Sequence, residues 1–303
     1  MASKLYTLLR KFSKSKTTVV FGGIVIAMLW GNVFFNYSES MRRDEQEVQS
    51  VNQNFSMVFG ENFRRFIGEI DKALLYVRGN INSSQGTPDF SKIVHSSDLI
   101  SEFIVQVSVI DAKGILRAST AGEQPAPPID LSDREHFRAQ VNATEDNIFI
   151  GKPLIGRASQ AWSIQFSRRF LNPDQTFAGV VVASLKPSHL IAFYDRLHFL
   201  APTSISIIGE DGIVRASGGS IAGFKLGEDL RATPLYKQIQ LGKNTNFEDS
   251  SYNSSSRLTN LHHIGGTTFW VAVSSDQALI HSNTMDDLKQ DSFVALIDRK
   301  SVV

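Results

Sequence analysis

The chain of 303 residues contains no cysteine, and its formal net charge at pH 7 is only +1. The absence of thiols excludes disulfides, thiol chemistry and cysteine metal ligands. The small net charge argues against nucleic-acid binding, and outside residues 1–16 the sequence has no basic run with interleaved aromatic residues. We therefore expect no nucleic-acid partner.

Motifs that assemble catalytic or phosphate-binding sites are also missing. The sequence has no His-Glu-x-x-His pair, no nucleophile elbow and no Gly-x-x-x-x-Gly-Lys loop. His262 and His263 are adjacent, but neighbouring side chains of a strand point to opposite faces and cannot readily share one metal ion. We expect the chain not to be an enzyme and to hold no cofactor or metal ion.

Residues 17–35 carry no charge and form a run long enough to span the hydrocarbon core of a bilayer. A cleaved signal peptide is the alternative, but the run is long for one and ends in Val33-Phe-Phe-Asn-Tyr37 rather than in a small-x-small site. Basic residues precede the run and Glu39 follows it, which by the positive-inside rule places the N-terminus in the cytoplasm. The basic residues are Lys4, Arg10, Lys11, Lys14 and Lys16. We predict a cytoplasmic tail over 1–16 and a transmembrane helix over 17–36, with the bulk of the chain extracytoplasmic.

Residues 37–82 are expected to form one long amphipathic stalk helix. No proline occurs between Ser38 and Asn82, and apolar residues recur at steps of three and four. The stripe is rich in phenylalanine, which a two-stranded coiled coil does not favour, so we expect its later half to pack on a sheet. The alternative is a purely parallel coiled coil. The apolar positions are Val48, Val51, Phe55, Val58, Phe59, Phe63, Phe66, Ile67, Ile70, Leu74, Val77 and Ile81.

Within the apolar run, Gly23, Ala27 and Gly31 lie four residues apart on one helical face. This small-xxx-small spacing lets two membrane helices approach closely. We therefore expect a homodimer through the transmembrane and stalk helices. A fortuitous stripe on a monomeric anchor is the alternative.

One stretch of the sequence occurs twice, because Val107–Thr120 returns as Ile205–Gly218 with half of the positions identical. Each copy has a run of β-branched residues, a turn closed by Gly114 or Gly212, and a second apolar run ending in Arg-Ala-Ser, which predicts a β-hairpin. A later Asp-Leu pair follows each hairpin at nearly the same offset. The duplicated unit is therefore about the size of a small domain, too long for a solenoid repeat.

After the first hairpin we predict a short helix that holds Phe137, and after the second hairpin a helical segment from about 227 to 239. Strands are expected in the first unit over 147–152, 162–170 and 177–185, and in the second near Phe247, over 257–264 and over 268–274. Residues 187–200 are predicted to form a connecting helix. The expected fold class is α+β: an N-terminal transmembrane helix, a long stalk helix, and two PAS-like units over 83–198 and 199–280, each with a mainly antiparallel five-stranded sheet. The tail over 281–303 has no second run that could span a membrane.

This organisation resembles the double Cache sensor, the extracytoplasmic input domain of many bacterial histidine kinases, diguanylate cyclases and chemoreceptors. The most recognisable stretches are Asp133-Arg-Glu-His-Phe137, Ile150–Arg157 and Trp162–Arg169. The resemblance implies a periplasmic sensor at the inner membrane, with a ligand site in the membrane-distal first unit and a structural relay in the second. The expected role is a signal-transduction input module, with the chain a truncated receptor without its output domain. A non-signalling anchored solute-binding or interaction protein is the alternative.

The best-defined subclass of that family recognises amino acids through an Arg-x-Trp-Tyr motif and a later Tyr-x-Asp motif. Here Arg134 keeps the arginine, His136 and Phe137 replace the two aromatic donors, and Leu154-Ile-Gly156 stands where the later motif would fall. The carboxylate that would pair with a ligand ammonium is then missing. A buried ammonium without a counter-charge is unfavourable, so amino acids and amines become poor candidates.

We therefore predict a small anionic ligand, such as an organic acid. Arg134 offers a planar donor fork, and His136, Lys152 and Arg157 add positive charge nearby. Ser163 and Gln165 share a strand face opposite Trp162 and Ile164, and we expect Trp162 in the core. The predicted ligand-binding residues are Arg134, His136, Phe137, Lys152, Arg157, Ser163 and Gln165.

Each of these residues also has a structural explanation. Arg134 would then pair with Asp130 or Glu135 at the surface, His136 would be a satisfied structural histidine, and Lys152 and Arg157 would be solvated loop charges. The second unit has other residue types at the equivalent positions, which favours a structural role for it. Those residues are Thr233, Leu235 and Tyr236.

Overall fold

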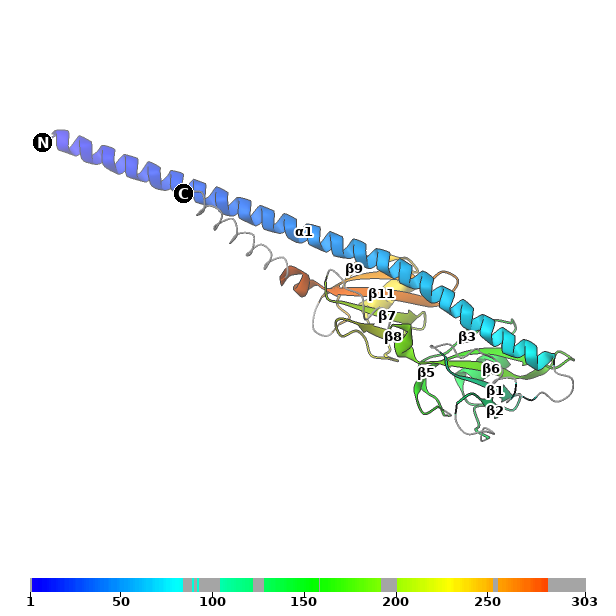
Figure 1. Ribbon diagram of the computed structural model, residues 1–303. Coiled ribbons are helices and arrows are strands. Elements are labelled where there is room, and N and C mark those ends of the chain that lie inside the picture. The colour runs from blue at the N-terminus through cyan, green and yellow to red at the C-terminus, as the bar shows by residue number, and fades with distance from the viewer. Residues whose placement is uncertain are drawn as a thin grey trace, which may run out of the picture. The chain divides into compact units, whose positions relative to one another are not determined.

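The computed structural model describes residues 2–83, 89, 92, 104–121, 128–157, 159–191, 201–252 and 256–282, with side chains from residue 19 onward (Figure 1). The chain divides into two compact units, one of Met1–Glu47 with Ile280–Val303 and the other of Val48–Leu279. Most of the tail predicted over 281–303, namely residues 283–303, and most of the predicted connecting helix, namely residues 192–200, lie outside the described residues.

Helix α1 runs without a break from Ala2 to Asn82 and contributes to both units. The predicted tail, transmembrane helix and stalk are therefore parts of one helix. Its apolar stretch near the N-terminus makes it the one described helix that is long and apolar enough to cross a membrane. In the same unit, Nε2 of His281 lies 2.7 Å from Oε1 of Glu45 on α1.

The first sheet domain, residues 104–191, contains a mainly antiparallel sheet with the strand order β2-β1-β6-β5-β3, and β4 also pairs with β5. Its elements are β1 (Ile104–Asp111), β2 (Leu116–Ser119), α3 (Glu135–Val141), β3 (Phe149–Ile150), β4 (Leu154–Ile155), β5 (Trp162–Leu171), β6 (Phe177–Leu185) and the 3₁₀ helix η1 (Pro187–Leu190). The strand predicted over 147–152 is thus a two-residue strand, and β4 adds a sixth strand to the expected five. Pro153 lies between them and has no N–H to donate, which ends the pairing.

The second sheet domain, residues 201–279, repeats this arrangement with the strand order β8-β7-β11-β10-β9. Its elements are β7 (Thr203–Gly209), β8 (Val214–Gly219), α4 (Pro234–Gln240), β9 (Thr245–Asp249), β10 (Arg257–His263) and β11 (Phe269–Asp276). The predicted α+β class with two antiparallel sheets is confirmed.

The duplicated hairpins have the same local geometry. Gly114 and Gly212 close the two turns with φ of 84° and 76°, in the left-handed region that favours glycine. Beyond each turn an isolated bridge joins the hairpin to the later Asp-Leu pair: Ile115 pairs with Asp130, and Ile213 with Asp229. The repeat found in the sequence is therefore a repeat of structure.

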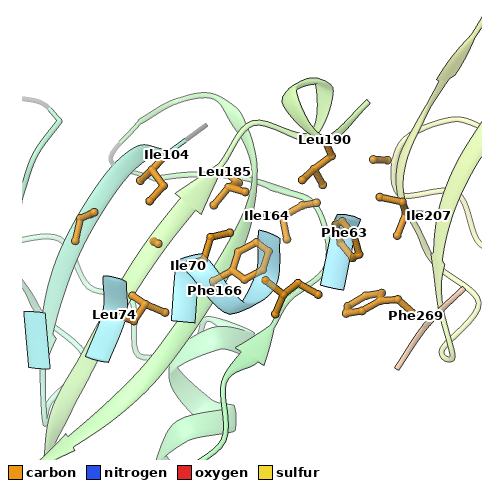
Figure 2. Close-up of a cluster of buried hydrophobic side chains, with 14 of the residues drawn as sticks. Phe63, Ile70, Leu74, Ile104, Ile164, Phe166, Leu185, Leu190, Ile207 and Phe269 are labelled. Atoms are coloured by element: carbon orange, nitrogen blue, oxygen red, sulfur yellow. The ribbon is translucent and has the colours of Figure 1, made fainter. Parts of the chain in front are cut away.

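The largest hydrophobic core lies where the later part of α1 packs on both sheets (Figure 2). Phe63 meets Phe269 of the second sheet edge-to-face at 5.9 Å, and Ile70 and Leu74 lie in the same cluster as Phe166 of the first sheet. The expectation that the phenylalanine-rich stripe packs on a sheet is confirmed, because the sheets cover the residues that a coiled coil would bury. Smaller cores fill the opposite faces, under α3 in the first domain and α4 in the second.

His262 and His263 point to opposite faces of β10, as expected. A Cβ added to Gly60 of α1 would lie 3.2 Å from Cδ2 of His262, so His262 is on the helix face. The ring of His263 lies 4.8 Å from that of Trp270, a residue of the core on the α4 side. The two imidazoles cannot share one ion.

Candidate functional site

A pocket lies on the α3 side of the first sheet, between strands β1, β5 and β6 and the segments on either side of them. The space that is open to the centres of water molecules has a volume of about 30 Å³. This is room for about two or three waters. The lining residues are Gln106, Ser108, Leu116, Leu131, Arg134, His136, Leu154, Gly156, Arg157, Gln165, Val182 and Ser184.

The floor of the pocket is polar, because alternate residues of the strands point to this face. Gln106 donates from Nε2 to Oγ of Ser119 at 2.7 Å, and Ser184 donates from Oγ to Oε1 of Gln165 at 2.6 Å. Gln165 donates in turn to Oγ of Ser163 at 2.8 Å. All five side chains are buried, so the polar floor is already hydrogen-bonded within the sheet.

The expectation that Ser163 and Gln165 share a face holds, and Gln165 lines the pocket while Ser163 supports it. Ile164 is buried against the helix side, as expected. The expectation that Trp162 lies in the core is wrong, since 49% of its surface is exposed. Trp162 is the first residue of β5 and pairs with Ile155, which is also exposed, so the core ends at Ile164.

His136 reaches the pocket from α3, which β5 holds in place. Ser167 on β5 donates from Oγ to the His136 carbonyl at 2.9 Å, and Gln140 donates to the Ser167 carbonyl at 2.8 Å. The imidazole is 5% exposed, and its Nδ1 has no hydrogen-bond partner among the described residues. Burial lowers the pKa of His136 to about 4, helped by the charge of Arg134 and opposed by Asp133. The imidazole is therefore neutral at pH 7.

Arg134 is the N-cap residue of α3, but its side chain makes no capping hydrogen bond. The side chain is half-buried and lines the pocket. Within the described ranges no acceptor is hydrogen-bonded or ion-paired to its guanidinium, and the alternative pairing with Asp130 or Glu135 is not seen. Arg134 thus brings a guanidinium without a hydrogen-bonded or ion-paired acceptor among the described residues beside a buried neutral imidazole.

Arg157 has a different environment, although it also lines the pocket. Its two Nη atoms donate to the two carboxylate oxygens of Asp133 at 2.6 and 2.7 Å, and Nη1 also donates to the Asp130 carbonyl at 2.7 Å. The hydrogen bond from Arg157 holds the pKa of Asp133 below its usual value. The charge of Arg157 is therefore matched by that of Asp133.

Three of the predicted site residues lie outside the pocket lining: Ser163, which accepts a hydrogen bond from Gln165, and Phe137 and Lys152. Phe137 is buried in the core on the α3 side, where its ring meets that of Phe177 edge-to-face at 5.9 Å. Lys152 is exposed, with Nζ 3.9 Å from Glu135 and 3.8 Å from Asp211. The structure therefore brings together Arg134, His136, Arg157 and Gln165 and leaves Phe137 and Lys152 elsewhere.

Sequence reasoning missed the pocket residues on the two central strands, Gln106, Ser108 and Ser184. A signal was present, because Gln106 and Ser108 interrupt the apolar run of β1 at alternate positions. Alternate polar residues in a strand that is otherwise apolar indicate a polar patch on one face. The segment Leu154–Gly156, where the family's later motif would fall, does reach the pocket and brings no carboxylate to it.

The two duplicated sheet domains and the long helix form a fold that several solved structures share. The extracellular domain of rpHK1S-Z16, which is named as a histidine kinase, matches with a TM-score of 0.65 at 21% identity, over 76% of this chain and 95% of that one. The ligand-binding domain of the amino acid chemoreceptor PctC of Pseudomonas aeruginosa, in complex with GABA, matches with a TM-score of 0.58 at 14% identity, over 75% and 99%.

The ligand-binding domain of the Pseudomonas fluorescens chemoreceptor CtaA, in complex with L-alanine, matches with a TM-score of 0.60 at 14% identity, over 76% of this chain and 98% of that one. These structures are ligand-binding domains, and this chain resembles only that kind of module. No protein-family model matches the sequence, and no curated protein matches it. The shared feature is the fold, which confirms the resemblance read from the sequence.

Proposed function

We propose that this chain is a membrane-anchored extracytoplasmic sensor whose first sheet domain binds a small anionic metabolite, such as an organic acid. The observation that carries the proposal is the unpaired guanidinium of Arg134 beside the buried imidazole of His136. A pocket with such a pair and no carboxylate among the described residues of its lining favours an anion.

The two groups have complementary roles toward a carboxylate. The guanidinium of Arg134 provides two parallel donors and a full charge, the geometry that matches a carboxylate. The buried Nδ1 of His136 lacks a partner, and an unsatisfied buried polar atom costs about 1–3 kcal/mol. When Nδ1 of the neutral imidazole carries the proton, it can donate a hydrogen bond to a ligand oxygen. That hydrogen bond removes the cost of the unsatisfied atom. Both groups thus gain from the same ligand.

The pocket offers little to an amine. An ammonium needs acceptors and a counter-charge, and the acceptors in the lining are neutral amide and hydroxyl oxygens. The carboxylate of Asp133, next to Arg134 in the sequence, has both of its oxygens hydrogen-bonded to Arg157. The PctC and CtaA domains are named with amino acids bound, whereas this lining supports a carboxylate without an ammonium.

The proposed anchor is the apolar stretch of α1, with the N-terminus in the cytoplasm and the chain at the inner membrane. The five basic residues before this stretch support that orientation. We include in the proposal a homodimer through the transmembrane and stalk segments, supported by the small-residue spacing of Gly23, Ala27 and Gly31.

The test is a thermal-shift screen of the full chain, purified in detergent, against a panel of organic carboxylates and a matched panel of amines. We expect stabilisation by one or more carboxylates, and we expect Arg134→Ala to abolish it. Arg138→Ala is the matched control, because Arg138 lies on the same helix but is exposed and outside the lining. Stabilisation by amines alone, or an equal loss in both variants, would overturn the proposal.

A further inference from the structure

The sheet face that carries the pocket has a counterpart in the second sheet domain. In the first domain, Gln106 of β1 and Gln165 of β5 both lie opposite Ser184 of the central strand β6. In the second domain, two polar residues flank the central strand β11 at the same register. They are Ser204 of β7 and Thr259 of β10, both opposite Ser274. The polar floor of the pocket was therefore duplicated with the fold.

In the second domain, this floor is covered by Arg257. Thr259 of β10 corresponds to Gln165 of β5. Arg257 lies two residues before Thr259, and Ser163 lies two residues before Gln165, so Arg257 corresponds to Ser163. Its side chain is 5% exposed overall. The guanidinium donates from Nη1 to Oγ of Ser204 and from Nη2 to the carbonyl of Ala222, both at 2.9 Å.

Tyr252 completes the cover. The guanidinium carbon of Arg257 lies 3.6 Å from the centroid of the Tyr252 ring, within the range of a cation–π contact. The ring of Phe224 stacks on the ring of Tyr252, with 4.4 Å between the two ring centroids. The Tyr252 hydroxyl donates to Oγ of Ser274 at 3.0 Å. Arg257 and Tyr252 therefore bond the two floor residues that correspond to Gln106 and Ser184.

The charge of Arg257 acts on an acidic residue of the same domain, because it opposes the rise that burial causes in the pKa of Asp249. Asp249 of β9 lies directly opposite Arg257 in the strand register and is fully buried. The backbone N–H of Ser251 donates to Oδ1 of Asp249 at 2.8 Å. A buried guanidinium needs hydrogen-bond acceptors, and both Nη atoms of Arg257 have one here.

We propose that the second sheet domain is a ligand site occupied by the chain's own side chains. Arg257 and Tyr252 take the place of a small guest on the duplicated polar floor, and the guest chemistry that fits this place is a planar guanidinium cation. The unmodified domain then has no room for a free ligand, and removal of the Arg257 side chain makes it a receptor for an added guanidinium compound. This proposal does not depend on which ligand the first domain binds.

The test is rescue of Arg257→Ser, which restores the residue of the first domain at this register. Trp270 is buried in the same cluster as Tyr252 and Phe224, so its fluorescence in the full chain carrying Trp30→Phe and Trp162→Phe follows this domain. We expect millimolar ethylguanidinium to raise the thermal midpoint of Arg257→Ser by about 2–4 °C. Arg257→Met, which keeps the volume filled, is the matched control and should not shift.

No shift in Arg257→Ser, or the same shift in the unmodified chain and in Arg257→Met, would overturn the proposal. Should the variants fail to fold, a crystal structure of the unmodified chain decides. The expected result is the Arg257 guanidinium over the Tyr252 ring, bonded to Ser204. An Arg257 side chain turned out of the domain, or a bound molecule on Ser204 and Ser274, contradicts it.

Discussion

Arg168 on β5 donates from Nη2 to Oδ2 of Asp71 on α1 at 2.8 Å, and its Nε bonds the other carboxylate oxygen. Nη1 of Arg168 also donates to Oδ1 of Asp146, which Arg78 of α1 contacts at 2.7 Å. The same strand carries Gln165, part of the pocket floor. One strand thus joins the candidate ligand site to the long helix by a buried, charged contact.

Replacing Arg168 is expected to loosen the helix from the first sheet domain. Arg168 is buried, and removing its guanidinium leaves Asp71 without its ion-pair partner. Because Asp71 and Asp146 are partly exposed and Asp146 keeps Arg78, we expect Arg168→Met to lower the free energy of unfolding by about 1–3 kcal/mol, measured by urea denaturation of the full chain. Arg64→Met is the control, because its ion pair with Glu61 is on the exposed face of the same helix and should leave stability unchanged. Equal effects of the two substitutions would contradict the role given to Arg168.

The buried imidazole of His136 predicts a loss of stability in mild acid. Burial lowers the folded-state pKa of His136 to about 4 from the model-peptide value of 6.5, so between these values the unfolded chain binds a proton that the folded chain does not. Stability is therefore fully present above about pH 6.5 and falls as the pH decreases toward 4, by about 2–4 kcal/mol in total.

Urea denaturation of the full chain at several pH values between 4 and 7 measures this loss. His136→Gln should flatten the pH dependence, because glutamine binds no proton in this range. His281→Gln is the control, since His281 is partly exposed and pairs with Glu45 rather than lying in the pocket. A curve for His136→Gln that is as steep as that of the unmodified chain would show that other groups cause the loss.

The contrast between Phe137 and Trp162 gives a test of which aromatic residues are structural. Phe137 is buried under the first sheet, and Phe→Ala substitutions in cores cost about 3–5 kcal/mol. Trp162 is half exposed, so Trp162→Ala should cost under about 1 kcal/mol. Chemical denaturation followed by circular dichroism compares the two. Similar losses for both would mean that Trp162 is packed after all.

Periodicity and turn chemistry are local properties, and they predicted α1, both hairpins and most strands. Whether a charged side chain forms an ion pair depends on contacts between segments that are distant in the sequence. A sequence pattern does not show such contacts. Arg134 and Arg157 are the same residue type near the same pocket, yet Arg157 pairs with Asp133 across a loop while Arg134 has no paired acceptor in the described part of the chain. His136 and Phe137 are neighbours on α3, and the packing of that short helix decides that one faces the pocket and the other the core.

The second domain shows the same limit more sharply. The sequence comparison correctly placed Leu235 and Tyr236 where the first domain has His136 and Phe137, and it indicated a structural role from the loss of the arginine. A different arginine, Arg257, comes from another strand and covers the polar floor. Its correspondence to Ser163 follows from the strand register and not from a sequence motif. Duplicated domains are thus better compared by register than by motif.

The absence of native cysteine makes the proposed orientation directly testable, because a single introduced thiol is then the only one to label. Ser13→Cys lies in the basic segment before the apolar run, and Asn54→Cys lies at an exposed position of α1 beyond it. In intact bacterial cells with a permeabilised outer membrane, a membrane-impermeant maleimide should label the thiol at position 54 and not the one at position 13. Disrupting the inner membrane should then expose both.

This labelling pattern is expected because the basic residues favour the cytoplasmic side. Labelling of position 13 alone before disruption would reverse the orientation, and labelling of both would remove the membrane anchor from the proposed function.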